Sequence, residues 1–381
     1  MSNRKGGQMH KHSILRRAAE VLEQANKSFL YAVIFPLLFR HRVNARTLET
    51  TDRLLIIRCD AIGDMILTTP LIRALKSNKK TLKICIAASD RNAQLIAADP
   101  DIEQIAILVK NGKLQLNAIQ TLRKFNPQVI MNCVTNETTK YGVLARIIAR
   151  NADSVALAHP QRSEYASLYT TLINVPDMYE RWYDDIMLEF ARQKFGIHAA
   201  LNDYLPHISI EKKHMDEAVE FLAAQGLHDG IPALVNLSAG QPRKRWSEEK
   251  YLKLIALLKK SCMGIILSSS PEDEDKAESI LLHAGNGVCR FRSTNIRGLA
   301  AIIARCAFVI TPDTSVIHVA SAMGTPVVAM YSESFSVIPQ WLPRAVPFRA
   351  VMTKEYAVEA ISPEEVFAGV CELRSVIDAN N

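Results

Sequence analysis

From about residue 51 onward, short apolar runs alternate with segments whose apolar residues recur at helical spacing. The apolar runs have the length of buried parallel strands, and the segments between them predict helices. Such a succession is typical of a parallel sheet with helices on both faces. In the first half, we expect strands at 54–57, 82–87, 105–109, 129–132 and 154–158 and helices at 64–76, 92–98, 114–124 and 141–149.

The second half repeats this plan after a stretch that has no periodicity. Residues 195–207 contain Gly196 and Pro206 among polar residues, which indicates a connection between two domains. The chain has 381 residues, which is longer than a domain with a single hydrophobic core usually is and is consistent with two domains. The second half predicts strands at 233–237, 264–268, 307–310 and 327–331 and helices at 211–225, 247–260, 273–283, 296–305, 313–324 and 363–377.

Residues 1–50 form an extension with a different composition. An apolar run at 29–39 lies between Lys27 and Arg40, and it is shorter than the roughly 20 residues that a helix needs to cross a bilayer. It fits either a helix packed on the N-terminal domain or an amphipathic, basic-flanked segment in the membrane interface. The pattern therefore divides the α/β chain into a basic extension at 1–50, domains at 51–200 and 207–350, and a C-terminal helical segment at 351–381.

The charge balance narrows the choice of partners. The chain has 46 Lys and Arg against 39 Asp and Glu, a net charge of +7, which suits a nucleotide, a phosphorylated lipid or a membrane surface. Nucleic acid is not an expected partner, because no helix-turn-helix, zinc or RNA-binding signature occurs. The 7 cysteines are scattered without a Cys-x-x-Cys motif, which indicates buried free thiols in a reducing cytoplasm and no metal site. The absence of Gly-x-Gly-x-x-Gly argues against a nicotinamide dehydrogenase.

One loop in the first domain is a candidate site. It joins the strand at 54–57 to the following helix at the carboxyl end of the strand, where ligands bind in open α/β sheets. Gly63 allows a ligand to approach the backbone closely. Asp64 lies at the expected start of the helix and could act in chemistry or as an N-cap, and Asp60 could contact a ligand or be a turn residue.

Two segments of the second domain are expected to meet at one anion site. The loop after its first strand contains a glycine, and Lys244 in this loop can meet a phosphate as a point charge. The helix that starts at Asp313 or Thr314 offers free N–H groups and the positive end of its dipole, and the hydroxyl groups of Thr314 and Ser315 add donors. His318 lies one turn later on the same side. The alternatives are solvated loop charges and a packed histidine.

The loop of the first domain resembles the N-terminal signature of glycosyltransferase family 9, the bacterial lipopolysaccharide heptosyltransferases. The matching run is Ile-Arg-Cys-Asp-Ala-Ile-Gly-Asp-Met-Ile-Leu-Thr-Thr-Pro, from Ile57 to Pro70. In that family the aspartate after the glycine is the proposed catalytic base, and the matching residue here is Asp64.

Segments of the second domain carry the same resemblance. Arg-Lys-Arg-Trp-Ser-Glu-Glu resembles the family's Lys-x-Trp-Pro-x-Glu loop, whose lysine contacts the donor, and this implies the same role for Lys244. Asp-Thr-Ser-Val-Ile-His, from Asp313 to His318, resembles the motif Asp-Thr-Gly-x-x-His that holds the donor diphosphate. Ser-Ser-Pro-Glu-Asp resembles the segment whose acidic residue binds the nucleotide ribose, and that residue is Asp273.

The resemblance spans roughly residues 53–377 and implies a GT-B fold, with two Rossmann-like domains facing each other across a cleft and here an extra N-terminal helical segment. It implies an inverting sugar transfer, without metal or cofactor, from a nucleotide diphosphate sugar on the second domain to an acceptor on the first. ADP-heptose and a lipid-linked lipopolysaccharide core are the expected substrates, and the expected location is cytoplasmic and peripheral to the bacterial inner membrane. Asp64 is the expected catalytic residue, and the expected substrate-binding residues are Asp60, Gly63, Ser238, Lys244, Asp273, Asp313, Thr314, Ser315 and His318.

Departures from the family pattern surround the expected donor pocket. Ser315 replaces a glycine, Ser247 a proline, Asp273 a glutamate, and Tyr-Ser-Glu-Ser from Tyr331 the usual Phe-Gly-Pro-Thr. They leave open the same fold with a UDP- or GDP-sugar and a surface polysaccharide. They also leave open a non-catalytic, membrane-associated binding protein, which the retention of Asp64, Lys244 and Asp313 argues against. Arg162 and Arg181 are candidate contacts to an acidic acceptor or solvated loop charges.

Overall fold

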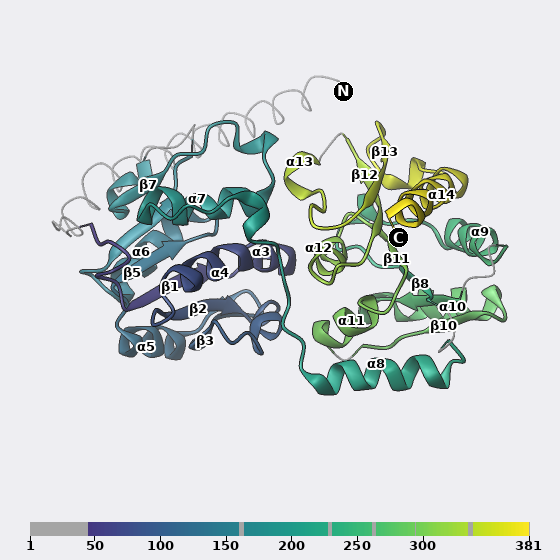
Figure 1. The fold of residues 1–381 in the computed structure, drawn as a ribbon, viewed down its shortest axis with the longest axis horizontal. Coiled ribbons are helices and arrows are strands. Elements are labelled where there is room, and N and C mark those ends of the chain that lie inside the picture. The colour runs from purple at the N-terminus through teal and green to yellow at the C-terminus, as the bar shows by residue number, and fades with distance from the viewer. Residues whose placement is uncertain are drawn as a thin grey trace, which may run out of the picture.

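The computed structural model describes residues 45–159, 164–227, 231–260, 264–293, 295–333 and 338–380. Within these residues the chain forms two α/β units, each built on its own sheet, which lie side by side (Figure 1). The predictions for the extension at 1–44, including its contact with a membrane, and for Arg162 lie outside the described residues. In the part of the chain that the structure describes, no helix is both long and apolar enough to cross a membrane.

The first unit contains a seven-stranded sheet in the order β4-β3-β2-β1-β5-β6-β7. All neighbouring strands are parallel except β3 and β4, which form an antiparallel pair. β1 is interior, and its Leu54 pairs with Ile84 of β2 and Val129 of β5. The strands are β1 (Arg53–Arg58), β2 (Lys83–Ser89), β3 (Gln104–Lys110), β4 (Lys113–Leu114), β5 (Val129–Asn132), β6 (Asp153–Leu157) and β7 (Thr171–Ile173).

Helices cover both faces of this sheet, as the continuous apolar runs of its strands require. Leu54 and Ile56 of β1 pack with α4 and α7, whereas Leu55 and Ile57 pack with α5 and α6. The helices are α3 (Ile62–Ile66), α4 (Thr69–Asn78), α5 (Leu116–Phe125), α6 (Thr138–Ile148) and α7 (Tyr183–Phe195), and the short 3-10 helices are η2 (Ala93–Ile96), η3 (Glu164–Leu168), η4 (Met178–Glu180) and η5 (Leu201–Asp203).

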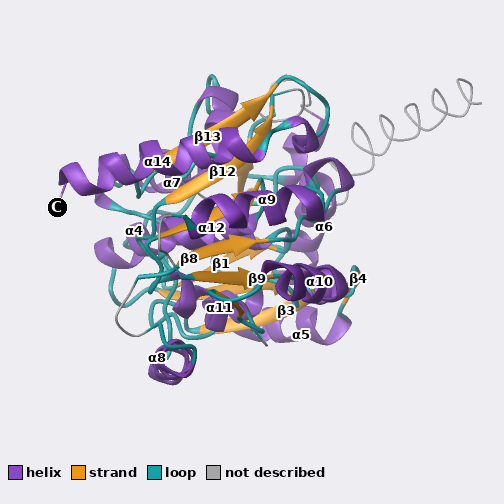
Figure 2. Ribbon diagram, turned by 90° about the vertical axis from the view of Figure 1, so that its right-hand side faces the viewer, coloured by secondary structure: helices purple, strands orange, loops and turns teal. Residues whose placement is uncertain are grey.

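The second unit contains a six-stranded parallel sheet in the order β10-β9-β8-β11-β12-β13. Figure 2 views the molecule from the side of this unit, with α9 and α10 in front of its strands. The strands are β8 (Ala233–Asn236), β9 (Ile265–Ser268), β10 (Val288–Arg290), β11 (Phe308–Pro312), β12 (Val327–Ser332) and β13 (Phe348–Thr353). The helices are α8 (Lys212–Ala224), α9 (Glu248–Lys259), α10 (Glu274–Ala284), α11 (Ile296–Ile303), α12 (Ser315–Ala322), α13 (Ile338–Trp341) and α14 (Pro363–Asn380), with 3-10 helices η6 (Pro242–Lys244), η7 (Pro271–Asp273) and η8 (Val358–Ala360).

The two units meet where α3 of the first faces α12 of the second (Figure 1). α3 follows β1 and α12 follows β11, so the carboxyl ends of interior strands from both sheets point toward the same interface. The apolar core continues across this interface, because Met65 and Ile66 of α3 belong to one buried cluster with Ile317 of α12. The predicted α/β architecture with two domains is therefore confirmed.

The predicted strands are present with small shifts of their ends, but several predicted helices differ. The helix expected at 64–76 is two helices, α3 and α4. Pro70 has no N–H to offer the carbonyl group of Ile66, which instead accepts a hydrogen bond of 2.7 Å from Thr69 Oγ1. The helix expected at 92–98 is only the turn η2, and Leu114 of the next predicted helix belongs to β4.

The sequence pattern does not predict β7, α7, β10, α13 and β13. The reason is clearest for α7, whose first turn buries both Asp184 and Asp185 beside Tyr183 and Ile186. Because charged and apolar residues are buried together there, the helix has no simple apolar stripe in its sequence.

Candidate active site

A cavity of about 230 Å³ lies where α3 meets α12. The first unit contributes the β1–α3 segment, and the second contributes the loop after β8, the start of α12, and α13. The cavity therefore lies at the carboxyl ends of parallel strands, the usual place for ligands in open α/β sheets. Its lining residues are Ala61, Gly63, Asp64, Lys244, Asp313, Thr314, Ser315, His318 and Trp341.

Asp64 lies in the first turn of α3 and lines the cavity from the side of the first unit. The helix begins at Ile62, its N-cap residue is Ala61, and no side chain caps it. The interpretation of Asp64 as an N-cap is therefore wrong. Its carboxylate is left to face the cavity, where it can accept a proton from a bound hydroxyl group.

Arg58, at the end of β1, holds the β1–α3 loop in place through buried hydrogen bonds. Its guanidinium is fully buried and donates hydrogen bonds to Asp64 O (3.1 Å), Asp60 Oδ2 (3.0 Å) and Thr68 Oγ1 (2.9 Å). It also donates to the carbonyl group of Cys133 after β5 and to the hydroxyl group of Tyr183 on α7. The sequence pattern predicted no role for Arg58, and the one local hint was that it is a charged residue at the end of an apolar strand.

Asp60 lies beside Arg58 and is not among the residues that line the cavity. Burial raises the pKa of its carboxyl group to about 6, in spite of the opposing charge of Arg58, and the nearby charge of Asp64 raises it further. Its Oδ1 atom is buried and has no hydrogen-bond partner among the described residues. The structure thus places Asp60 as part of the support of the loop.

Gly63 of the first unit lies against the His318 ring of the second unit at the cavity. A Cβ atom at position 63 would lie only 2.7 Å from Cδ2 of His318, so the contact requires a glycine. The His318 imidazole is buried, and its Nδ1 atom has no hydrogen-bond partner within the described ranges. Burial lowers the pKa of His318 to about 4, so the ring is neutral at pH 7.

The second unit brings a cation and a helix N-terminus to the cavity. Lys244, in η6, forms an ion pair of 2.6 Å with Asp313, and both side chains are partly exposed to the cavity. Thr314 is the N-cap residue of α12, and its Oγ1 atom accepts a hydrogen bond from Val316 N. The ammonium group and the first turn of α12 together can bind an anionic group such as a diphosphate.

Ser238 and Asp273 lie in a neighbouring cluster and are absent from the cavity lining. Ser238 Oγ accepts a hydrogen bond of 2.8 Å from Ser270 N, and Ser270 Oγ donates to Asp273 Oδ2 over 3.2 Å. Asn236 joins this cluster to the start of α12, because its side-chain amide donates to Ser238 O and to Thr311 Oγ1. The structure therefore divides the predicted donor residues between two adjacent places.

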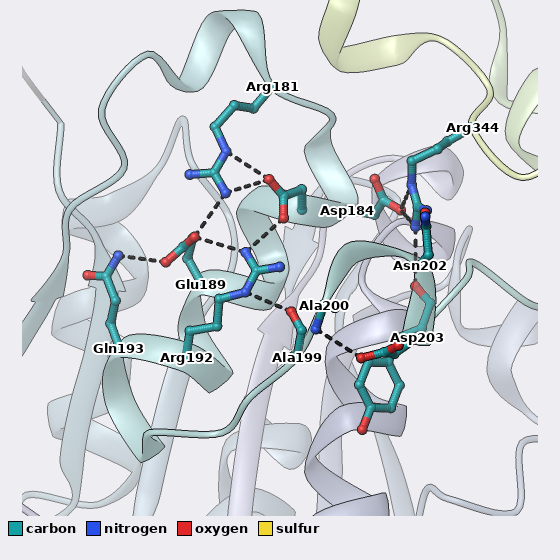
Figure 3. A network of polar contacts seen from close by, with 12 residues as sticks. Arg181, Asp184, Glu189, Arg192, Gln193, Ala199, Ala200, Asn202, Asp203 and Arg344 are labelled. Atoms are coloured by element: carbon teal, nitrogen blue, oxygen red, sulfur yellow. Dashed lines mark hydrogen bonds and ion pairs between the residues drawn. The ribbon is translucent and has the colours of Figure 1, made fainter.

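Trp341, from α13, lines the cavity, and the sequence pattern did not predict it as a site residue. Its ring stacks on Tyr183 of the first unit, with 4.9 Å between ring centroids and 19° between planes. It meets the His318 ring edge-on at 6.1 Å. No motif surrounds Trp341, so the sequence offered no signal for this role. The guanidinium of Arg181, a candidate acceptor contact, instead pairs with Asp185 on α7. It also pairs with Glu189 on the same helix, as Figure 3 shows.

Solved structures define the class of this protein. A glycosyltransferase family 9 protein from Veillonella parvula has a TM-score of 0.72 at 21% identity, over 86% of this chain and 98% of that one. An Escherichia coli heptosyltransferase determined with ADP has a TM-score of 0.68 at 16% identity, over 85% of this chain and 98% of that one. The fold is thus GT-B, the two-domain architecture of one large class of glycosyltransferases.

Sequence relatives define the family within this class. The model of glycosyltransferase family 9 (heptosyltransferase) matches residues 161–359. The lipooligosaccharide heptosyltransferase 2 of Haemophilus influenzae is 24% identical over 76% of this chain and 85% of the relative. The lipopolysaccharide heptosyltransferase 3 of Escherichia coli is 24% identical over 74% of this chain and 82% of the relative. The chain belongs to glycosyltransferase family 9, and the protein is a glycosyltransferase.

Proposed function

We propose that this enzyme transfers a heptose from ADP-heptose to the inner core of lipopolysaccharide, with inversion at the anomeric carbon. The observation that carries the proposal is the position of Asp64 on one wall of the cavity and of Lys244 and the start of α12 on the other. A base from the acceptor side and positive charge from the donor side are what such a transfer needs. The heptosyltransferases among the relatives support the choice of sugar and acceptor.

In the proposed mechanism, Asp64 accepts the proton of the acceptor hydroxyl group as its oxygen attacks the anomeric carbon. The bond from that oxygen to the anomeric carbon forms while the bond from the carbon to the diphosphate breaks. Negative charge then develops on the departing diphosphate, and Lys244 and the N–H groups at the start of α12 stabilise it. Neutral His318 lies between the two sides without adding charge.

We propose that the reaction needs no metal ion, because Lys244 supplies positive charge next to the departing group. Within the described ranges, no three His, Cys, Asp or Glu side chains are grouped as metal ligands. The net charge of +7 supports binding at the inner face of the inner membrane, where a phosphorylated, lipid-linked acceptor is anchored. In this proposal the enzyme is cytoplasmic and binds the membrane peripherally.

The first test is thermal stabilisation by ADP, UDP, GDP and CMP at matched concentration, first without metal and then with magnesium. A ligand that binds only the folded protein at a hundredfold excess over its Kd stabilises it by about 2.7 kcal/mol. Selective stabilisation by ADP without metal supports ADP-heptose. Selective stabilisation by UDP or GDP contradicts the donor and favours a different nucleotide sugar, to which the serine at position 315 in the cavity wall would be an adaptation.

The second test is Asp64→Asn, with Asp216→Asn as the control. Asp216 pairs with Lys212 on the surface of α8 and lies outside the cavity. We expect Asp64→Asn to abolish turnover while ADP still binds, because the nucleotide contacts come from the second unit. Near-normal turnover by this variant would exclude Asp64 as the base. Absence of activity and of nucleotide binding in the unmodified protein would instead favour a non-catalytic binding protein.

A further inference from the structure

A short segment of the second unit lies on the first unit beside the cavity. It comprises α13 and the residues up to Arg344, and it follows β12 in the chain. Within it, Gln340 Nε2 donates a buried hydrogen bond of 2.5 Å to the carbonyl group of Met178 in η4. The segment follows the second sheet in the sequence, and it contacts both units, because the hydroxyl group of Tyr331 in β12 donates a hydrogen bond of 3.3 Å to the carbonyl group of Trp341.

Arg344 makes the principal polar contact of this segment. Its guanidinium donates to Asp184 Oδ2 from Nη2 at 2.6 Å and from Nε at 3.0 Å, and the two side chains are only 8% and 2% exposed. Nη1 also donates to Asn202 Oδ1 at 3.1 Å and Nη2 to Tyr204 O at 3.2 Å. Figure 3 shows Arg344 reaching down to Asp184 and to the residues that connect the two units. The Arg344 side chain therefore binds both α7 and the chain segment that connects the two units.

The α13 segment also contacts Tyr183, the residue before Asp184 on α7. Tyr183, one residue earlier on α7, stacks on Trp341, and Trp341 lines the cavity and meets His318. The hydroxyl group of Tyr183 in turn accepts a hydrogen bond from Arg58 beneath the Asp64 loop. A continuous series of contacts therefore joins the support of Asp64 to α12 on the donor side.

We propose that Arg344 is a positioning residue. Its hydrogen bonds to Asp184 and to residues 202 and 204, which connect the two units, hold the Trp341 indole between Tyr183 and His318. Trp341 then fixes the spacing between the wall that carries Asp64 and the wall that carries Lys244. This inference rests on the proposed sugar transfer, in which the two walls must meet one acceptor and one donor at the same time. Arg344 touches neither substrate and acts through Trp341.

The buried pair is better explained by this geometric role than by stability. Removing two charges from water costs free energy that their attraction often fails to recover. Burial raises the pKa of Asp184 even though Arg344 lowers it, so desolvation outweighs the attraction at this site. By contrast, the partly buried network of Arg181, Asp185 and Glu189 stays within one unit and cannot set the distance between units.

The first experiment compares Arg344→Ala with Arg349→Ala. Arg349 is a matched control, because it pairs with exposed Glu372 inside the second unit. We expect Arg344→Ala to lower kcat at least tenfold per folded enzyme while the Kd for ADP changes less than threefold, because Lys244 and α12 are untouched. Arg349→Ala should match the unmodified enzyme in both. A loss confined to melting temperature, with kcat intact, would overturn the proposal and leave only a structural role.

The second experiment asks whether Arg344 acts through Trp341. Trp341→Ala should lower kcat by a similar factor, and adding Arg344→Ala to it should lower kcat by less than a further threefold. Losses that multiply would show independent roles and overturn the proposal. If Arg344→Ala fails to fold, the double variant Asp184→Asn/Arg344→Gln replaces it in this cycle, because it leaves no buried charge unpaired.

A third measurement needs no activity and separates this inference from the proposed function. Small-angle X-ray scattering should show a larger radius of gyration for Arg344→Ala than for the unmodified protein and Arg349→Ala, because the two units are less firmly held together. An unchanged radius would overturn the inference. If the protein transfers no sugar but Arg344→Ala still has the larger radius of gyration, the role of Arg344 in holding the two units together is supported and only the proposed reaction is refuted.

Discussion

Lys244 and Asp313 face each other inside the cavity, with 2.6 Å between Nζ and Oδ2. The carboxylate of Asp313 fixes the direction of the ammonium group, and it would itself repel a diphosphate. The resemblance to family 9 implied that Asp313 helps to hold the donor. We propose a more specific part for Asp313, which is to orient Lys244 toward the anion that the proposed reaction releases.

Lys244→Ala is expected to lower kcat about 100-fold, the usual cost of losing one preorganised group that stabilises developing charge. Asp313→Asn should have a smaller effect, because the ammonium group remains but is less firmly oriented. Steady-state kinetics of sugar transfer would measure both. Lys253→Ala is the control, since Lys253 forms an exposed pair with Glu249 on α9. Equal losses at Lys244 and Lys253 would contradict a specific role.

Gly63→Ala tests the contact between the units directly. The added methyl group would lie 2.7 Å from the His318 ring, and overpacking of this kind costs about 1–3 kcal/mol of unfolding free energy. Urea denaturation would measure this loss. In a His318→Ala background the ring is absent, so the same substitution should be neutral or stabilising by up to about 1 kcal/mol, as Gly→Ala usually is in a helix. An equal loss in both backgrounds would refute the steric explanation.

Arg58→Ala should cost about 3–5 kcal/mol of unfolding free energy, because it removes a buried guanidinium and leaves its acceptors unpaired. Arg58→Lys should be intermediate, since one ammonium group cannot reach Asp60, Thr68 and the Cys133 carbonyl group together. Chemical denaturation would measure both values. Arg53 is a control at the other end of β1, where its guanidinium donates to the exposed carbonyl group of Asn126. Its replacement by Ala should cost less than about 1 kcal/mol.

Asp60 and His318 make opposite contributions to stability as pH changes. The pKa of Asp60 is raised from 3.8 to about 6 in the folded protein, so its stabilising contribution is complete below pH 3.8 and is lost as pH rises through 6. The pKa of His318 is lowered from 6.5 to about 4, so the unfolded chain binds the extra proton between these values. The contribution of His318 therefore grows as pH rises from 4 to 6.5.

This opposition can be measured with Asp60→Asn and His318→Gln. As pH rises from 4 to 6, the unfolding free energy of Asp60→Asn should increase relative to that of the unmodified protein. The variant lacks the Asp60 carboxyl group, whose contribution to stability falls over this range. As pH rises from 4 to 6.5, the unfolding free energy of His318→Gln should decrease relative to that of the unmodified protein, because the variant lacks the imidazole whose contribution rises over this range. Denaturant titrations across this range would give both differences. Two variants with parallel pH profiles would contradict the assignment.

The sequence predicted the interior strands of both sheets and the polar residues that line the cavity because both leave local signals. Leu54 to Ile57 reads as a buried strand, and Gly63, Asp64, Lys244 and Thr314 each follow the carboxyl end of a predicted strand. Parallel strands bring such positions to one edge of a sheet, so a placement along the chain becomes a placement in space.

Trp341, Tyr183 and Arg344 could not be predicted in the same way. Their roles depend on contacts between segments far apart in the chain, such as Arg344 with Asp184, and nothing in their local sequence encodes the partner. The short helix that carries Trp341 has no periodic pattern, and α7 buries charged residues in its first turn. Arg58 was overlooked for a different reason, since one charged residue at a strand end is also common on protein surfaces.

The position of β1, β8 and β11 in the interior of their sheets has a consequence for how this enzyme can diversify. Asp64, Lys244 and Thr314 all follow these interior strands. Among the described residues, the loops at the margins of the sheets, such as the turn between β3 and β4, contribute none of the charged side chains that line the cavity. Mutations in the margin loops can therefore change those loops while the proposed reacting groups keep their positions.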